Sequence, residues 1–311
     1  MIFIPYVCCG DPSIEFTEKL VRTLAPHSDI IELGIPFSDP IADGKTIQAA
    51  ANRSLANGTT IEQIFEMVAR LRENGTNTNG TITDITNGTD KVVVVPFVFM
   101  TYFNIIYAYG CEMFLKRMKE TGVQGLIIPD LPFGEDVEFE KLAESCGISI
   151  INLIAPNTTN ERAEQILENS RNTNAPFTYL VSSAGTTGTK DGVSPESTEF
   201  VKRIRLLAGN QSDRRVPTVS SGVCAHSVTT SQIVDAASSG VSDPQFVNGN
   251  KNNNRLCVGF GISTKEQAQE YVKAGADGVI VGSKIIEIYN KHEKQQDALK
   301  EIEGFVRDLE K

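Results

Sequence analysis

The sequence of 311 residues predicts an α/β fold: a single (β/α)8 barrel (TIM barrel) domain, residues 1–311, with two polar surface insertions. Apolar runs alternate with segments of helical spacing, and such alternation is typical of a parallel sheet with right-handed crossovers. Eight such units in a chain of this length favour closure into a barrel. An open, doubly wound sheet is the alternative, but no G-x-G-x-x-G motif follows the first strand.

The first half of the chain contributes four strand–helix units. Turn residues at 10–13 and the sequence TIEQ at 60–63 carry helix-start chemistry, and KVVVVPFVF at 91–99 has the nearly continuous apolar character of a strand buried on both faces. We expect strands at residues 2–7, 28–33, 91–99 and 124–130, and helices at residues 14–24, 46–56, 60–71, 113–120 and 135–145.

The second half repeats the alternation. Its apolar runs are separated by segments in which apolar residues recur at helical spacing. We expect strands at residues 148–154, 177–182 and 278–281 and in the run that begins at Leu256, and helices at residues 161–168, 196–207, 264–274 and from 283 to 309.

Two segments interrupt this pattern. Residues 74–90 consist largely of Asn, Thr and Gly, and residues 209–255 are rich in Ser, Asn, Gln and Asp, with a possible short helix at 231–237. Segments so poor in apolar residues bury too little surface to offset the entropy of ordering. We expect a low-complexity surface insertion at 74–90, and a second at 209–255 that enters before the seventh strand, at the bottom of the barrel.

Composition excludes several classes of function. The formal net charge is -10 and no basic patch stands out, which disfavours nucleic acid and anionic membranes as partners. No apolar run is long enough to span a bilayer, and the first ten residues lack signal-peptide features. Six scattered cysteines without a C-x-x-C pair, and three dispersed histidines, predict no metal site and a reducing cytoplasmic location.

Two acids stand where buried carboxylates need an explanation. Glu32 ends the apolar run of the second strand, and Asp43 lies in the Gly/Pro-rich loop that follows. Burial disfavours an ionised carboxylate, so such a group is either paired for structure or used for proton transfer. Asp130 ends the fourth strand in the same way, while Tyr102 and Tyr179 belong to the third and sixth units. We expect all of them at the mouth formed by the carboxyl ends of the strands.

A second group of residues suggests a phosphate site. In barrels of this type, the loops after strands seven and eight bind phosphate through glycine backbone N–H groups and a helix N-terminus. Gly261, Gly282 and Ser283 occupy these loops, and Gly188 after strand six is a further candidate donor. Apolar residues expected between the acids and this anchor suit a flat aromatic substrate on a phosphorylated tail; they are Ile47, Phe260 and Ile280.

The segment ELGIPFSDPIADGKTIQ at 32–48 closely resembles the signature of the tryptophan synthase alpha chain family. The resemblance covers nearly all of the chain outside the insertions and extends to PYVCCGDP at 5–12, MTYFN at 100–104, PDLP at 129–132, YLVS at 179–182, GFGI at 259–262 and GS at 282–283. It implies a lyase that cleaves indole-3-glycerol phosphate to indole and glyceraldehyde 3-phosphate in tryptophan biosynthesis.

The same resemblance implies roles for single residues. Glu32 matches the catalytic general acid/base and Asp43 the catalytic aspartate that binds the indole N–H. Tyr179 matches a tyrosine near the substrate, and Thr187 a loop threonine that approaches Asp43 when the site closes. The positions that match the phosphate-binding residues are Gly188, Gly261, Gly282 and Ser283.

The family also implies a partner, a pyridoxal-phosphate beta chain in an α2β2 assembly, and Pro36 and Asp39 match loop positions at that interface. No cofactor site is evident in this chain itself.

Two departures from the family pattern stand out. Family members usually begin with a helix before the first strand, so we expect a helical segment upstream of Met1; and Ser183 replaces the arginine usual after strand six, which weakens the expected loop closure.

Structural explanations and rival functions stay open at this point. Glu32 could cap neighbouring backbone, Asp39, Asp43 and Asp130 could be turn or cap residues, and Tyr179, Phe260 and Ile280 could fill the core. Indole-glycerol-phosphate synthase is a rival enzyme, but its pattern includes a catalytic lysine near the strand ends, absent from the apolar strand starts here. A catalytically weak chain kept as an allosteric binding subunit is a rival of another class.

Overall fold

A computed structural model describes residues 1–73, 93–182, 192–210, 254–259 and 261–310. In these residues one parallel sheet runs in the order β5-β4-β3-β2-β1-β9-β8-β7-β6. The strands are β1 (Ile2–Cys8), β2 (Ile31–Gly34), β3 (Phe97–Met100), β4 (Val123–Ile127), β5 (Ser149–Ile150), β6 (Leu153–Ile154), β7 (Thr178–Val181), β8 (Leu256–Gly259) and β9 (Gly278–Val281).

The sheet closes on itself because its two end strands are pieces of one extended segment. β5 pairs with β4 and β6 pairs with β7, and only Ile151 and Asn152 separate them. The Ile151 N–H donates to the Leu126 carbonyl (2.9 Å), and the Tyr179 N–H donates to the Asn152 carbonyl (3.0 Å). The predicted (β/α)8 barrel is therefore confirmed, and the open doubly wound sheet is wrong.

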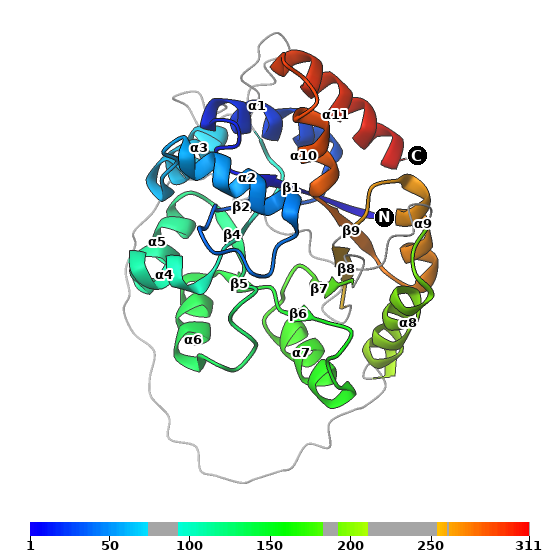
Figure 1. Ribbon diagram of the computed structural model, residues 1–311. Coiled ribbons are helices and arrows are strands. Elements are labelled where there is room, and N and C mark those ends of the chain that lie inside the picture. Colours follow the sequence, from blue (N-terminus) through cyan, green and yellow to red (C-terminus); the bar gives the residue numbers. More distant parts are fainter. Residues whose placement is uncertain (74–92, 183–191, 211–253, 260, 311) are drawn as a thin grey trace.

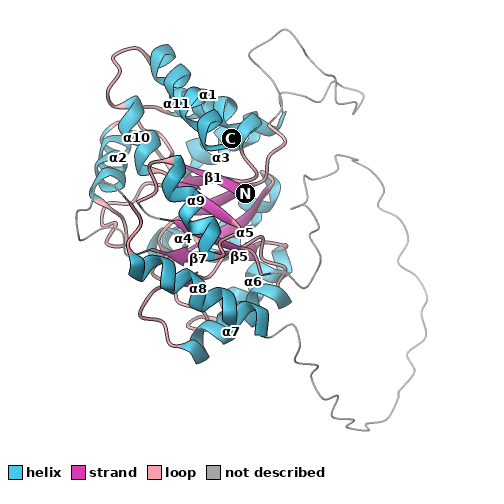
Figure 2. Cartoon of the chain, turned by 90° about the vertical axis from the view of Figure 1, so that its right-hand side faces the viewer, coloured by secondary structure: helices cyan, strands magenta, loops and turns pink. Residues whose placement is uncertain are grey.

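Helices surround this barrel on all sides (Figures 1 and 2). Their apolar faces pack on the strands to form one continuous core. They are α1 (Ile14–Leu24), α2 (Lys45–Ala56), α3 (Ile61–Glu73), α4 (Phe103–Tyr109), α5 (Cys111–Glu120), α6 (Val137–Cys146), α7 (Asn160–Asn172), α8 (Pro195–Asn210), α9 (Lys265–Ala274), α10 (Ser283–Tyr289) and α11 (Gln295–Glu310), with a 3-10 turn at Ala25–His27. No helix in the described residues is long and apolar enough to cross a membrane.

The third strand is shorter than predicted. The prediction was 91–99, whereas β3 begins at Phe97, after Pro96, which has no N–H to donate. Before β3 the chain is held by a side chain instead of a strand. The Arg72 guanidinium donates to the carbonyls of Val93 (2.6 Å) and Val95 (2.9 Å), and it lies 4.0 Å from the Phe97 ring centroid. An apolar run alone did not reveal this side-chain partner.

The predicted insertions fall mainly outside the described residues. Residues 74–90 and 211–253, including the helix predicted at 231–237, lie there. The helix predicted at 196–207 continues to Asn210 in α8, so the first two residues assigned to the second insertion belong to a helix. Helix α4 was not predicted; the N–H of Phe103 at its start donates to the Asp130 carboxylate (2.9 Å), so the cap interpretation of Asp130 is correct.

Candidate active site

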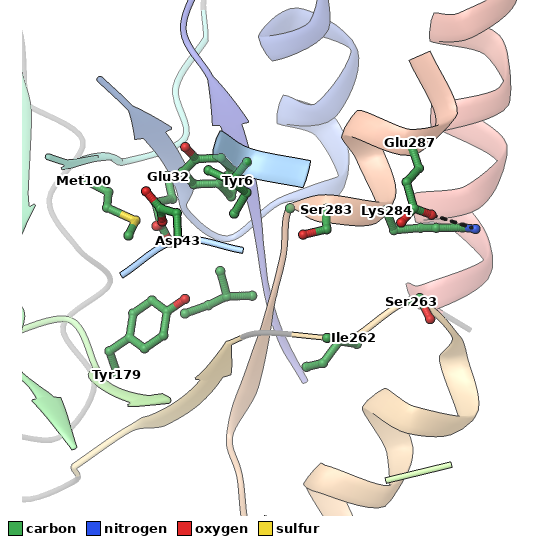
Figure 3. A pocket seen from close by; sticks show the side chains of 14 residues that line it. Tyr6, Glu32, Asp43, Met100, Tyr179, Ile262, Ser263, Ser283, Lys284 and Glu287 are labelled. Atoms are coloured by element: carbon green, nitrogen blue, oxygen red, sulfur yellow. Dashed lines mark ion pairs between the residues drawn. The ribbon is translucent and has the colours of Figure 1, made fainter. Parts of the chain in front are cut away.

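A cavity of about 190 Å³ opens at the carboxyl ends of the strands (Figure 3). Glu32 and Asp43 line one end, and Ser263, Ser283, Lys284 and Glu287 line the other (Figure 3). The residues that line it are Tyr6, Glu32, Asp43, Ile47, Met100, Tyr179, Gly261, Ile262, Ser263, Ile280, Gly282, Ser283, Lys284 and Glu287. Eight residues chosen from the sequence are among them: Glu32, Asp43, Ile47, Tyr179, Gly261, Ile280, Gly282 and Ser283.

The remaining predicted residues do not line the cavity or cannot be placed. Thr187, Gly188 and Phe260 lie outside the described residues, as does Ser183. Tyr102 is described, but it lies behind the loop that carries Asp43. In the predicted interface loop Pro36 is buried and Asp39 is exposed.

Glu32 is the most unusual charged side chain of the cavity. It lies on β2, where it pairs in register with Tyr6 of β1 and Val98 of β3, and it is 0% exposed. Neither carboxylate oxygen has a hydrogen-bond partner within the described part of the chain. Burial, and secondly the negative charge of Asp43, raise the pKa of Glu32 to about 8. Glu32 therefore carries a proton at neutral pH and faces a cavity large enough for a substrate group.

Asp43 is held by its loop rather than by a strand. Its Oδ2 accepts a hydrogen bond from the Tyr102 hydroxyl (3.0 Å), and its Oδ1 is buried without a partner among the described residues. The Gln48 side chain donates to the Asp43 carbonyl (2.8 Å) and so ties the loop to the first turn of α2. Burial raises the pKa of Asp43 to about 6, and the Tyr102 hydrogen bond opposes this rise. Asp43 is thus mainly ionised at neutral pH, with one oxygen free.

Tyr102 was expected among the substrate-binding residues, and in the described part of the chain it does not line the cavity. Its ring stacks on Phe37 with centroids 5.0 Å apart, and its hydroxyl also accepts from the Ala42 N–H (3.0 Å). It therefore braces the loop and orients the Asp43 carboxylate from outside the cavity. The sequence places Tyr102 at the correct strand end, but not on the correct side of the Asp43 loop.

Two of the tyrosines that line the cavity lie directly against glycines of a neighbouring strand. A Cβ atom on Gly34 would lie 2.2 Å from the Tyr6 hydroxyl oxygen, and one on Gly259 would lie 2.0 Å from that of Tyr179. Each glycine is therefore required so that a tyrosine ring can cross the neighbouring strand. In the parallel register Tyr6 pairs with Glu32 and Tyr179 pairs with Cys257. Each glycine lies two residues after the partner of its tyrosine.

The opposite end of the cavity offers backbone N–H groups. Helix α9 begins with a complete capping box, in which Gln267 and Thr264 satisfy each other's backbone. At the start of α10, by contrast, Gly282 supplies no side-chain cap, and Ser283 follows at the cavity surface. An uncapped first turn attracts an anion through its free N–H groups and the helix dipole. Gly261 adds a positive φ of 77°, which suits glycine.

Several lining residues were missed by the sequence reasoning: Tyr6, Met100, Ile262, Ser263, Lys284 and Glu287. Tyr6 lies near the carboxyl end of the strand expected at 2–7, and Met100 directly follows the strand expected at 91–99, but both residue types are also common in a core. Lys284 forms an ion pair with Glu287 (3.6 Å) at the edge of the cavity, beside Ser283 (Figure 3). It is the lining residue that supplies a positive charge near the uncapped helix start.

Metal ligation has no support in this geometry. The described residues contain no group of three or more His, Cys, Asp or Glu side chains able to hold a metal ion. Five cysteines in the described residues are free thiols. The chemistry that the cavity can perform rests on one protonated acid, one ionised acid and an anion anchor.

Sequence comparisons identify a family. The sequence profile of the family described as "Tryptophan synthase alpha chain" matches residues 1–241 and 244–311. Among curated relatives, tryptophan synthase alpha chains from Methanocaldococcus jannaschii and Thermococcus kodakarensis are 34% and 33% identical to this chain. The alignments cover 97% and 98% of this chain, and 84% and 97% of those relatives.

Solved structures give the same result. The tryptophan synthase complex of Pyrococcus furiosus superimposes with a TM-score of 0.71 at 29% identity, over 99% of this chain and 97% of that one. A structure of the tryptophan synthase a2b2 complex from the same organism gives a TM-score of 0.73 at 30% identity. With a family profile spanning nearly all of its length and relatives above 30% identity, the chain belongs to the tryptophan synthase alpha chain family.

Proposed function

We propose that this protein is the alpha subunit of tryptophan synthase, a lyase that cleaves indole-3-glycerol phosphate to indole and glyceraldehyde 3-phosphate. The observation that carries the proposal is Glu32, a fully buried carboxylate without a partner in the described residues, at the wall of a cavity. The reaction is a retro-aldol cleavage, which requires a proton on the indole ring carbon and removal of a proton from the adjacent hydroxyl.

Glu32 suits both proton transfers. With a pKa near 8, its carboxyl group is protonated at neutral pH and delivers that proton to the ring carbon that bears the side chain. The resulting carboxylate then accepts the proton of the neighbouring hydroxyl as the carbon–carbon bond breaks, and the acid is regenerated. Such a positioned acid/base contributes about 10²–10⁴-fold to a rate. Its place on a strand keeps its geometry fixed.

Asp43 stabilises the charge that this step creates. Protonation of the ring carbon leaves a cationic indolenine, and a carboxylate beside the ring N–H lowers the energy of that cation. Asp43 is mainly ionised at neutral pH, and its Oδ1 is unoccupied by any described residue. Because it lies on a loop, we assign its final alignment to closure over substrate, with Thr187 as its partner.

The rest of the cavity holds the substrate. Ile47, Ile280 and Tyr179 flank the indole, with Phe260 assigned to the same apolar slot from its neighbouring sequence position. We assign the phosphate to the N–H groups around Gly261, Gly282 and Ser283, with Gly188 as a further donor. Ser283 lies away from Glu32 and Asp43 along the cavity (Figure 3), and Gly261 and Gly282 also line it, which suits a substrate with an aromatic head and an anionic tail.

The partner is the tryptophan synthase beta chain, a pyridoxal-phosphate enzyme that takes up indole in an α2β2 complex. Asp39 and the 85% exposed Ile41 lie at the outer surface of the loop between the two acids. We assign the contact with the beta chain to this loop, so that binding of the beta chain would depend on the position of Asp43. Pro36 shapes the loop from its buried side. Free thiols in the described residues are consistent with a reducing cytoplasm.

Indole release from indole-3-glycerol phosphate, with and without a beta chain, tests the proposal. We expect wild-type turnover that rises on addition of the beta chain, and losses of about 10²–10⁴-fold in Glu32→Gln and of a similar order in Asp43→Asn. Glu120→Gln on the exposed surface of α5 is the matched control and should retain full activity. Undiminished turnover in Glu32→Gln would refute the assigned mechanism.

The same assay separates the rivals. An indole-glycerol-phosphate synthase would form the substrate from its ring-open precursor with release of carbon dioxide, and would release no indole. A pure binding subunit would release no indole alone or in the complex, yet would still change the activity of the beta chain.

A further inference from the structure

A second buried carboxylate lies next to the cavity and outside its lining. The side chain of Asp11, in the loop after β1, is 0% exposed. Its Oδ1 accepts from Arg53 Nε (2.9 Å), and its Oδ2 accepts from the other side of the same guanidinium (2.6 Å) and from the Tyr289 hydroxyl (2.5 Å). We call Asp11, Arg53 and Tyr289 the buried triad after the carboxylate at its centre; the Arg53 side chain itself is 39% exposed.

Each member of the buried triad belongs to, or directly follows, an element that also lines the cavity. Asp11 follows β1, which supplies Tyr6. Arg53 is six residues after Ile47 on α2, and Tyr289 is six residues after Ser283 on α10. The triad therefore joins the helix that follows the Asp43 loop to the helix that starts at the phosphate end.

Neighbouring contacts make these joints rigid. The Ser54 hydroxyl of α2 donates to the Cys9 carbonyl (2.6 Å), and the Asn57 side chain donates to the Pro12 carbonyl (2.8 Å). The Tyr289 ring packs edge-on against Phe16 of α1, with centroids 5.3 Å apart. A bidentate guanidinium–carboxylate contact is stronger and more directional than an ordinary hydrogen bond, which makes Asp11 a fixed reference point.

We infer that the buried triad sets the distance between the acid end and the phosphate end of the cavity, and that Arg53 and Tyr289 are positioning residues for the cleavage. The inference rests on the proposed function. The substrate connects its aromatic head to its phosphate through three carbons, so both ends bind together only if the two subsites are correctly spaced. A separate fragment occupies one subsite and is insensitive to that spacing.

The test compares linked and separate ligands on the full-length chain. Isothermal titration would give dissociation constants for indole, for glycerol 3-phosphate, and for an unreactive compound in which a plain three-carbon chain joins indole to phosphate. In Tyr289→Phe, which keeps the ring packed on Phe16, we expect affinity for the linked compound to fall about tenfold while both fragments stay within twofold. Arg53→Lys keeps the positive charge but loses the two-point hydrogen bonding of the guanidinium to Asp11, and it should show the same pattern.

A matched control exists on the surface. Tyr109 donates to Glu62, which also pairs with Arg117, in a tyrosine–carboxylate–guanidinium arrangement remote from the cavity lining. Tyr109→Phe should leave all three affinities unchanged. Equal losses for fragments and linked compound in Tyr289→Phe, or no loss for the linked compound in either variant, would overturn the inference. Failure of the wild-type chain to bind the linked compound would instead refute the proposed function.

Discussion

Asp11 and Glu32 are both buried carboxylates at the carboxyl ends of neighbouring strands, and their surroundings differ in every other respect. Asp11 receives three hydrogen bonds from a guanidinium and a phenol. Glu32 receives none from the described residues, and burial with the nearby charge of Asp43 raises its pKa to about 8. One acid has its hydrogen bonds supplied by neighbouring side chains, and the other receives none and is kept protonated mainly by burial.

The difference separates structure from chemistry. A buried acid whose hydrogen bonds are complete contributes to folding, and removing it leaves its partners unsatisfied. A buried acid without partners costs stability and is ready to exchange a proton with a ligand. Asp43, with one hydrogen bond and one free oxygen, lies between these extremes. The following predictions test this ordering.

The largest effect on stability is expected at Asp11. Asp11→Asn removes the charge that Arg53 and Tyr289 surround, and the free energy of unfolding at pH 7 should fall by about 3 kcal/mol. Glu32→Gln should leave stability unchanged or raise it, because no partner is lost. Urea denaturation of both variants gives the two values. Equal destabilisation by the two substitutions would contradict the assignment of Asp11 to stability and of Glu32 to proton transfer.

The pH dependence of stability follows from Glu32. Its pKa is about 8 in the folded chain against an ordinary value near 4.5, so between these values the folded state holds a proton that the unfolded state has lost. Stability from this group is therefore complete below pH 4.5 and is lost as pH rises through 8. Glu32→Gln should remove this loss, which amounts to about 4 kcal/mol between pH 5 and 8.5. Parallel stability curves for the variant and the wild type would contradict it.

A smaller effect is expected at Tyr102, the one described side chain bonded to the Asp43 carboxylate. Tyr102→Phe removes a hydrogen bond that lowers the pKa of Asp43, so this pKa rises. The acid limb of the kcat/KM profile should move to higher pH, and kcat should fall about tenfold because Asp43 loses its orientation. Tyr107→Phe, on the exposed face of α4, is the control. An unmoved acid limb would show that Tyr102 does not act through Asp43.

The smallest effect is expected at the partly exposed pair of Lys284 and Glu287. Lys284→Met should raise KM for the phosphorylated substrate about threefold and change the free energy of unfolding by less than about 1 kcal/mol. Glu287→Gln, which releases Lys284 from its ion pair, should not raise KM. Steady-state kinetics of both variants measure this, and an equal rise in KM in both would assign the effect to the pair rather than to the cation.

Much of the fold could be predicted, because strand–helix alternation is a local pattern. The strand predicted at 278–281 has the observed bounds of β9, but the boundaries of other strands could not be predicted. The second strand was expected at 28–33 and begins at Ile31, since Ser28 closes the preceding 3-10 turn and the Asp29 carboxylate accepts from the Phe3 N–H (2.8 Å). The single strand predicted at 148–154 is split in two, as its halves pair with different neighbours. Such boundaries depend on tertiary partners that periodicity does not report.

The site was predictable where chemistry shows at a strand end. Glu32, Asp43, Gly282 and Ser283 combine an informative residue type with an informative position. Tyr6 was missed because one aromatic residue in an apolar strand looks like core. The place of Tyr102 behind the Asp43 loop depends on how that loop folds over it, which no spacing in the sequence encodes.

The closure of the barrel through one split strand has a consequence for ligand binding. Glu32 and Asp43 belong to the half of the chain before β5, and Gly261 and Gly282 to the half after β6. The cavity therefore spans two halves that meet along β1–β9 and at Ile151 and Asn152. A substrate held at both ends acts as a cross-link between these halves. A substrate concentration of a hundred times the dissociation constant adds about 2.7 kcal/mol to the free energy of unfolding of the barrel. The enzyme without substrate is therefore the form that unfolds and is degraded more easily.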